Sequence, residues 1–301
     1  NLEKKITSFN SNTNGLIAPE FNNNPWQYKF TWNPRNVVVA GQGVSRFLHH
    51  GQFKYIPYHN LFRRVERETV LDVGEFEVYP NRDSLKYIEL YGLKGIESIC
   101  RGTMRRPGYS EAWNAFVQLG LTDDSFVMED SENMTNRDFV NSFLRYKKNK
   151  PVEEKMAEYL GIDPEGQIME KIKWTGLFER KKIGLKNATP AQILQHIIEP
   201  KWQLGNDEKD MIVMQHIFEY KLDDMVKEIR SSLVVKGKDT VNTAMSITVG
   251  IPVAIATKLL LTGKFALKGV QIPVIPEMYN PILKELEEFD IKFIEEERIL
   301  E

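Results

Sequence analysis

The sequence contains a single cysteine, Cys100, among its 301 residues. One thiol cannot close an internal disulfide, so we expect a chain that folds in a reducing compartment, the cytoplasm. Charge of one sign is also lacking, because 40 lysines and arginines stand against 42 aspartates and glutamates, for a net charge of −2. This balance argues against a protein that coats nucleic acid or an acidic membrane surface.

Long uninterrupted apolar runs are lacking as well. The longest run, residues 251–261, contains Pro252 and Lys258 and is shorter than the roughly 20 residues that a bilayer-spanning helix needs. No signal peptide is evident, and the first residue is Asn1 rather than methionine. We therefore expect no membrane association, and we expect that this chain is part of a longer protein.

Motifs for metals, hydrolysis and nucleotides are also missing. The five histidines show no metal-ligand spacing, and no G-x-S-x-G sequence occurs. Gly41-Gln42-Gly43 resembles the start of a dinucleotide-binding G-x-G-x-x-G motif, but Arg46 occupies the sixth position. The sequence therefore predicts neither a metal site nor a cradle for nucleotide phosphates.

What is present is a change from strand signals to helix signals and back. Aromatic and β-branched segments predict strands at 28–32, 53–57 and 75–79, while helical spacing predicts a helix over 37–50 and polar residues at 10–14 predict a turn. Capping residues predict four helices after residue 108. Strand signals return at 211–214 and 226–235, followed by helices over 243–261 and 281–289.

This order predicts an α+β fold with three parts. Residues 1–107 and 205–242 would form a mixed α/β domain, which we expect to bind substrate and to mediate dimerisation. Residues 108–204 would form an all-helical insertion into that domain. Residues 243–301 would form a C-terminal helical segment.

The densest local chemistry is a group of arginines. Arg82, Arg101 and Arg105 can each bind a carboxylate through two parallel hydrogen bonds, and Thr103 adds a hydroxyl group. One interpretation is a pocket for a small polycarboxylate. The alternative is a surface cluster whose arginines pair with Asp83 and Glu89.

Several motifs, spread from residue 14 to residue 283, resemble the C-terminal catalytic domain of glutamate-forming saccharopine dehydrogenases. Two of them are Tyr79-Pro80-Asn81-Arg82-Asp83-Ser84 and Arg101-Gly102-Thr103-Met104-Arg105. The others occur in the same order at 14–20, 23–25, 28–34, 107–114, 208–214, 248–252 and 276–283.

The resemblance implies an activity. Enzymes of this family use NAD or NADP to oxidise saccharopine, a secondary amine that joins lysine and glutamate, and yield 2-aminoadipate 6-semialdehyde and glutamate. In the family fold, an N-terminal Rossmann domain binds the dinucleotide, the C-terminal helices pack against it, and the sheet domain forms a homodimer. The resemblance places the Rossmann domain and the principal proton-transfer residue before Asn1.

The resemblance also assigns site residues. It places substrate contacts at Arg82 and at Thr103, Met104 and Arg105, and cofactor contacts at Asn33 and Thr13. Two positions depart from the family pattern, since relatives usually have serine at the position of Asn33 and cysteine at the position of Thr13.

Two alternatives and the choice of cofactor stay open at this stage. The substrate could instead be another amine or imine, as in carboxynorspermidine dehydrogenases, because Thr13-Asn14 replaces the usual Cys-Gly. The chain could also be a non-catalytic dimerisation or binding module. The choice between NAD and NADP is made outside this chain.

Overall fold

The computed structural model describes residues 5–223 and 225–300, and within them the dominant element is one mixed nine-stranded sheet. The strands follow the order β3-β2-β6-β1-β7-β8-β9, while β5 also pairs with β6 and β4 pairs with β5. β1 runs parallel to β6, and the other pairs are antiparallel. The strands are β1 Lys5–Ile17, β2 Val44–His49, β3 Gln52–Pro57, β4 Glu66–Val70, β5 Gly74–Pro80, β6 Ser98–Arg105, β7 Asp210–Leu222, β8 Met225–Lys236 and β9 Ile294–Ile299.

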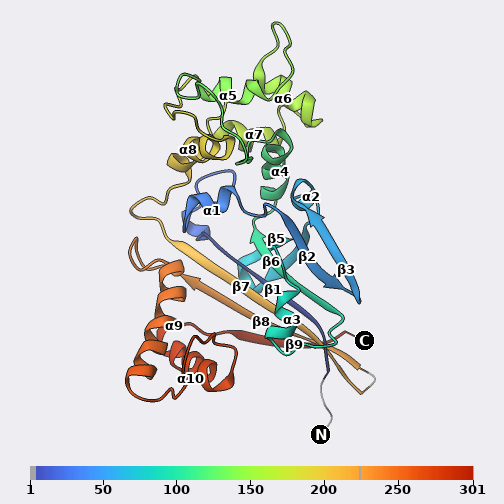
Figure 1. Ribbon diagram of the computed structural model, residues 1–301, viewed down its shortest axis with the longest axis vertical. Coiled ribbons are helices and arrows are strands. Elements are labelled where there is room, and N and C mark those ends of the chain that lie inside the picture. Colours follow the sequence, from blue (N-terminus) through green and yellow to red (C-terminus); the bar gives the residue numbers. More distant parts are fainter. Residues whose placement is uncertain (1–4, 224, 301) are drawn as a thin grey trace.

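Five helices between β6 and β7 gather at one end of the sheet (Figure 1). Their starts and stops follow the capping signals: Thr135 and Thr189 form capping boxes, and Gly120 and Gly161 end helices in the left-handed conformation. The α+β fold class is thereby confirmed. The helices are α4 Tyr109–Leu119, α5 Asn136–Ser142, α6 Val152–Leu160, α7 Gln167–Trp174 and α8 Pro190–Trp202, of which α7 was not predicted.

The C-terminal helices α9 (Ala244–Leu261) and α10 (Pro276–Leu286) pack against each other, and α9 contacts β7 and β8. α9 continues through Pro252 and has 18 residues with a mean hydropathy of 1.8, which is long and apolar enough to cross a membrane. The expectation that no segment reaches that length is therefore wrong. A single helix of this kind is weak evidence for a membrane span.

Three local predictions were wrong because the presence or absence of a partner strand, rather than local spacing, determines which residues form strands. Residues 37–50 are not a helix: α1 (Pro34–Val38) is short, and Val44–His49 forms β2 instead. His50 and Gly51 have φ of 46° and 74°, as a two-residue hairpin turn into β3 requires. The polar residues 10–14 lie inside β1, and residues 28–32 contribute one isolated bridge, from Phe30 to Gln203.

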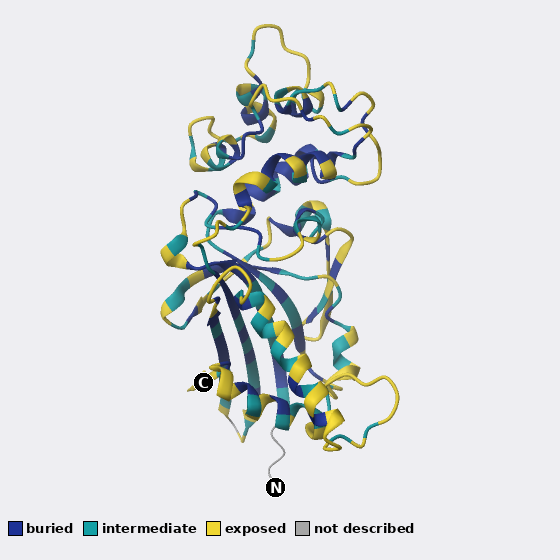
Figure 2. Ribbon diagram, turned by 90° about the vertical axis from the view of Figure 1, so that its left-hand side faces the viewer, coloured by how far each residue is buried: buried dark blue, intermediate teal, exposed yellow. Residues whose placement is uncertain are grey.

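The remaining short elements lie around the sheet. α2 (Tyr58–Leu61) contacts β2 and β3, and the final predicted helix begins at Pro276 rather than at 281. Buried residues run along the strands and continue into the helices at the end of the sheet (Figure 2). The short helices are α3 Lys86–Leu90, η1 Pro19–Phe21, η2 Leu71–Val73 and η3 Glu287–Phe289.

Asp210, at the start of β7, joins the sheet to the N-terminus of α9. Its buried carboxylate accepts hydrogen bonds from the backbone N–H groups of Ala244 (2.6 Å) and Met245 (3.0 Å). A negative charge at this position also interacts favourably with the helix dipole. The C-terminal helices are thus fixed to the sheet by a specific polar contact.

We expect Asp210→Ala to lower the free energy of unfolding by about 2–4 kcal/mol, because two charge-assisted hydrogen bonds at a helix N-terminus are lost. Urea unfolding of the purified protein measures this difference. Asp207→Ala, at an exposed position three residues earlier, is the matched control and should change the urea midpoint little. Equal midpoints for the two variants would contradict the role of Asp210.

Candidate functional site

A cavity of about 810 Å³ lies between the sheet and the C-terminal helices. Thr13 on β1 is in register with Thr103 on β6, and both line the cavity. The two strands are parallel, so their carboxyl ends meet at the same edge of the sheet, where ligand sites often form. Met245 and Thr248 on α9 line the cavity from the helical side.

Four of the six predicted site residues line this one cavity: Thr13, Arg82, Thr103 and Arg105. Met104 does not, because alternation along β6 directs its side chain into the core on the other side. The carbonyl of Met104 accepts a hydrogen bond from the Asn14 side chain (2.9 Å), which does line the cavity.

Asn33 is likewise not among the lining residues. Its side chain accepts a hydrogen bond from the backbone N–H of Arg35 (3.0 Å) and so caps α1. Asn36, further along α1, lines the cavity instead. The structure therefore gives Asn33 a helix-capping role, and its cofactor contact stays a prediction.

Arg105 is a buried cation surrounded by tyrosine rings. Its guanidinium carbon lies 4.7 Å from the ring centroid of Tyr28, 4.8 Å from that of Tyr109 and 5.9 Å from that of Tyr79. Such contacts stabilise a cation by interaction with the ring quadrupole. Burial raises the pKa of Tyr28 to about 12 and the pKa values of Tyr79 and Tyr109 above their ordinary value, so the hydroxyls are neutral at neutral pH.

The charge of Arg105 is consequently uncompensated. The residue is 2% exposed, its Nε has no hydrogen-bond partner, and no carboxylate pairs with it in the described part of the chain. A buried charge without a partner is costly in free energy. A ligand carboxylate that enters the cavity would supply the missing partner.

The other cavity arginines are also free of carboxylates. Arg101 stacks on the Tyr87 ring at 4.4 Å, and Arg82 lies in the exposed loop after β5 with φ of 51°. Asp83 pairs with Arg46 instead. Within residues 5–223 and 225–300, neither Asp83 nor Glu89 pairs with the arginines of the cluster, so the self-paired surface cluster is not what forms.

The result is a cavity with a strongly positive lining. Arg82, Arg101, Arg105 and Lys86 line it, whereas its one acidic lining residue, Asp83, is already paired. This arrangement fits a ligand with several carboxylates. In the described residues, no group of three histidine, cysteine, aspartate or glutamate side chains could hold a metal ion.

Sequence reasoning missed the tyrosines and the glycine that complete this site. Tyr28, Tyr79 and Tyr109 are distant in the sequence and follow no common spacing. At Gly15, an added Cβ would lie 2.4 Å from Thr31 Oγ1 and 2.9 Å from Met245 Cε, so glycine allows α9 to approach β1. The polar run around Gly15 was the available signal, but it was interpreted as a turn.

Comparison with known proteins identifies the family. The model of the saccharopine dehydrogenase C-terminal domain matches residues 1–291. The chain belongs to this family. The resemblance seen in the sequence motifs is thereby confirmed, and it places the chain in a family of oxidoreductases of amino-acid metabolism.

Individual relatives support the assignment. The chain is 31% identical over 290 residues to the NADP(+)-dependent, L-glutamate-forming saccharopine dehydrogenase of Saccharomyces cerevisiae, and it covers 65% of that protein. It is 31% identical over 300 residues to the mitochondrial alpha-aminoadipic semialdehyde synthase of Mus musculus and covers 32% of it. The chain therefore spans only about a third to two thirds of these relatives.

A solved structure gives the same result for the fold. The apo saccharopine dehydrogenase (L-Glu forming) from Saccharomyces cerevisiae superposes with a TM-score of 0.87 at 30% sequence identity. The match covers 99% of this chain and 68% of the solved chain. The saccharopine dehydrogenase C-terminal domain therefore has the same arrangement of sheet and helices in both proteins.

Proposed function

We propose that this chain forms the substrate-binding part of an NAD(P)-dependent oxidoreductase that converts saccharopine to 2-aminoadipate 6-semialdehyde and glutamate. The observation that carries the proposal is the cavity in which Arg82, Arg101 and Arg105 have no carboxylate partner within the described residues. Saccharopine has three carboxylates, so its charges complement these guanidinium groups.

The contribution of the chain to the reaction is binding and orientation. Arg105 holds one carboxylate in a dry environment, and the more exposed Arg82 holds another at the rim. The Thr13 hydroxyl donates a hydrogen bond to the carbonyl of Val213 (3.0 Å), which fixes the orientation of this side chain. These contacts fix the position of the substrate amine relative to the cofactor.

The nicotinamide cofactor would be held mainly outside this chain, because the described residues contain no glycine-rich phosphate loop. When bound, it would supply the hydride acceptor for oxidation of the substrate amine to an imine, with the proton of the amine nitrogen released to solvent. Water then hydrolyses the resulting imine to an aldehyde and the amine of glutamate. Thr13, which lines the cavity, is our first candidate for a cofactor contact, and Asn33 is the second.

Further parts of the proposal concern assembly and location. α9 exposes Val249 and Val253, by 59% and 63%, and we assign this apolar face to packing against the dinucleotide-binding domain. We also propose a homodimer formed through the sheet domain. The cytoplasm stays our prediction for the compartment, although the mouse relative is named as mitochondrial.

The decisive experiment supplies the purified full-length protein with saccharopine and either NAD or NADP. Appearance of the near-ultraviolet absorbance of the reduced nicotinamide is the expected result. A carboxylated polyamine, tested in parallel, separates saccharopine from a carboxynorspermidine-type substrate. Failure to reduce either cofactor with saccharopine would contradict the proposal and favour the other amine substrate or a non-catalytic module.

Arg82→Ala should raise the KM for saccharopine about fivefold with little change in kcat. The contact is charge-assisted but solvent-exposed, so its contribution is about 1 kcal/mol. Steady-state kinetics of the full-length enzyme measure the effect. Arg63→Ala, an exposed arginine outside the cavity, should leave KM unchanged. A KM for Arg82→Ala equal to that of the wild type would remove this residue from the site.

A further inference from the structure

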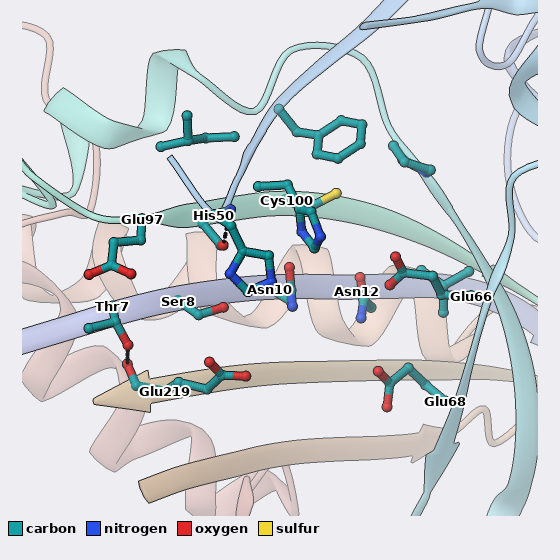
Figure 3. A pocket seen from close by; sticks show the side chains of 16 residues that line it. Thr7, Ser8, Asn10, Asn12, His50, Glu66, Glu68, Glu97, Cys100 and Glu219 are labelled. Carbon is teal, nitrogen blue, oxygen red and sulfur yellow. Dashed lines mark hydrogen bonds between the residues drawn. The ribbon is translucent and has the colours of Figure 1, made fainter. Parts of the chain in front are cut away.

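A second pocket, of about 150 Å³, lies on the other face of the sheet (Figure 3). Asn10 and Asn12 line it from β1, whereas Thr13, the next residue along the strand, points to the opposite face and lines the first cavity. The strands β4 and β5 fold over this face, where Thr69 accepts a hydrogen bond from Gln215 and Glu68 pairs with Arg230. The two pockets are therefore separated by the sheet.

The second pocket has the opposite charge to the first. Glu66, Glu68, Glu97 and Glu219 line it together with His49 and His50, and no lysine or arginine is among its lining residues. Arg230 pairs with Glu68, and Lys221 pairs with Glu97 at 3.8 Å. In the described part of the chain, no lysine or arginine forms an ion pair with the exposed Glu66 or the half-buried Glu219, so both carboxylates are available to a cationic ligand.

A buried amide provides an independent indication of a ligand. Asn12 is only 5% exposed and lines the pocket, yet its side chain has no hydrogen-bond partner within residues 5–223 and 225–300. The amide atoms of Asn12 are open to the pocket, so a ligand that enters it can form hydrogen bonds with them. A ligand with N–H groups in the pocket would satisfy the carbonyl oxygen of this amide.

The neighbouring glycine preserves this arrangement. A Cβ at Gly102, which is in register with Asn12, would lie 2.3 Å from Asn12 Oδ1 and 2.3 Å from Val78 Cγ1. The φ of Gly102 is not positive, so the backbone conformation does not require glycine here. Glycine at 102 instead leaves the space that the Asn12 side chain occupies.

Other ligand classes do not fit. No group of three potential ligand side chains in the described residues could hold a metal ion. Burial, together with the charge of Glu66, raises the pKa of the Cys100 thiol to about 12, so the pocket does not contain a reactive thiolate. The acidic lining repels anions. The volume equals that of about five waters at liquid density, which is enough for a short chain.

We propose that this pocket binds a small organic dication, a short linear diamine. Figure 3 shows Glu97 and Glu219 near one end of the pocket and Glu66 and Glu68 near the other, with Asn10 and Asn12 between them. An ammonium group at each end meets an uncompensated carboxylate, Glu219 or Glu66. The amide of Asn12 accepts a hydrogen bond from the ammonium group nearer to Glu66.

The test is isothermal titration of 1,5-diaminopentane into the full-length protein at low ionic strength. We expect one site per chain, with affinity at least tenfold weaker in Glu66→Gln and in Glu219→Gln. Glu89→Gln, an exposed glutamate on α3, is the matched control and should bind like the wild type. No binding by the wild type, or equal affinity in all variants, would overturn the proposal.

Two measurements on the wild type test the diamine site even if the variants fail to fold. 1-Aminopentane, which has one ammonium group, should bind at least tenfold more weakly than the diamine, and equal binding would overturn the two-ended site. Saturating saccharopine should not displace the diamine, because the sheet separates the pockets. Displacement would place the diamine in the first cavity and overturn the proposal, whatever the enzyme's activity on saccharopine.

Discussion

Arg105→Met should raise the KM of the full-length enzyme for saccharopine about a hundredfold, while leaving the ligand-free protein as stable as the wild type or more stable. The buried guanidinium meets tyrosine rings but no carboxylate in the described residues. Removing one partner of a buried charge pair costs about 3 kcal/mol in binding. Without ligand, the unpaired buried charge lowers the stability of the folded protein. Apolar replacements of buried charges are often stabilising.

The measurements separate these two effects. Steady-state kinetics give KM, and urea unfolding of the ligand-free protein gives stability. Glutarate, a dicarboxylate, should raise the melting temperature of the wild type but not that of Arg105→Met. Arg64→Met, at an exposed position, controls for loss of a positive charge. It should match the wild type in KM, in urea stability and in the response of its melting temperature to glutarate. A marked loss of stability in ligand-free Arg105→Met would show that the guanidinium is structural.

The fold could be predicted where local signals act alone. Capping residues such as Thr135, Thr189 and Gly120 determine helix ends through contacts within a few residues, and these ends were correct. Strand identity depends on partners far along the chain. Residues 10–13 are in register with β6 and residues 10–14 with β7, some 90 and 200 residues away. Their polar composition alone indicated a turn.

The charged residues of the site could be predicted from the sequence, but the side chains that surround them could not. Arginines are visible in the sequence, and their lack of carboxylate partners makes them available to a ligand. The tyrosine rings around Arg105 come from a loop, from β5 and from α4, which only the complete fold brings together. Glu66 likewise joins Asn12 and Glu219 in lining the second pocket only because β4 folds over the far face of the sheet.

Trp202, at the end of α8, connects the helices to the sheet. Its ring centroid lies 5.2 Å from those of Trp26 and Tyr28 and 5.3 Å from that of Phe30. The carbonyl of Trp202 also accepts a hydrogen bond from the backbone N–H of Phe30 (2.7 Å). The Trp202 side chain is fully buried, so the packing of this aromatic cluster depends on the volume of its ring.

Trp202→Ala should therefore lower the free energy of unfolding by about 3–5 kcal/mol, as measured by urea unfolding. Trp32→Ala, at a position that is 44% exposed, should cost much less, and equal losses would contradict the role of the buried cluster. Because Tyr28 and Tyr109 contact both Trp202 and Arg105, the cavity also loosens, and the KM for saccharopine should rise severalfold. Trp202→Phe should restore most of both losses, since an aromatic ring again supports the tyrosines that surround Arg105.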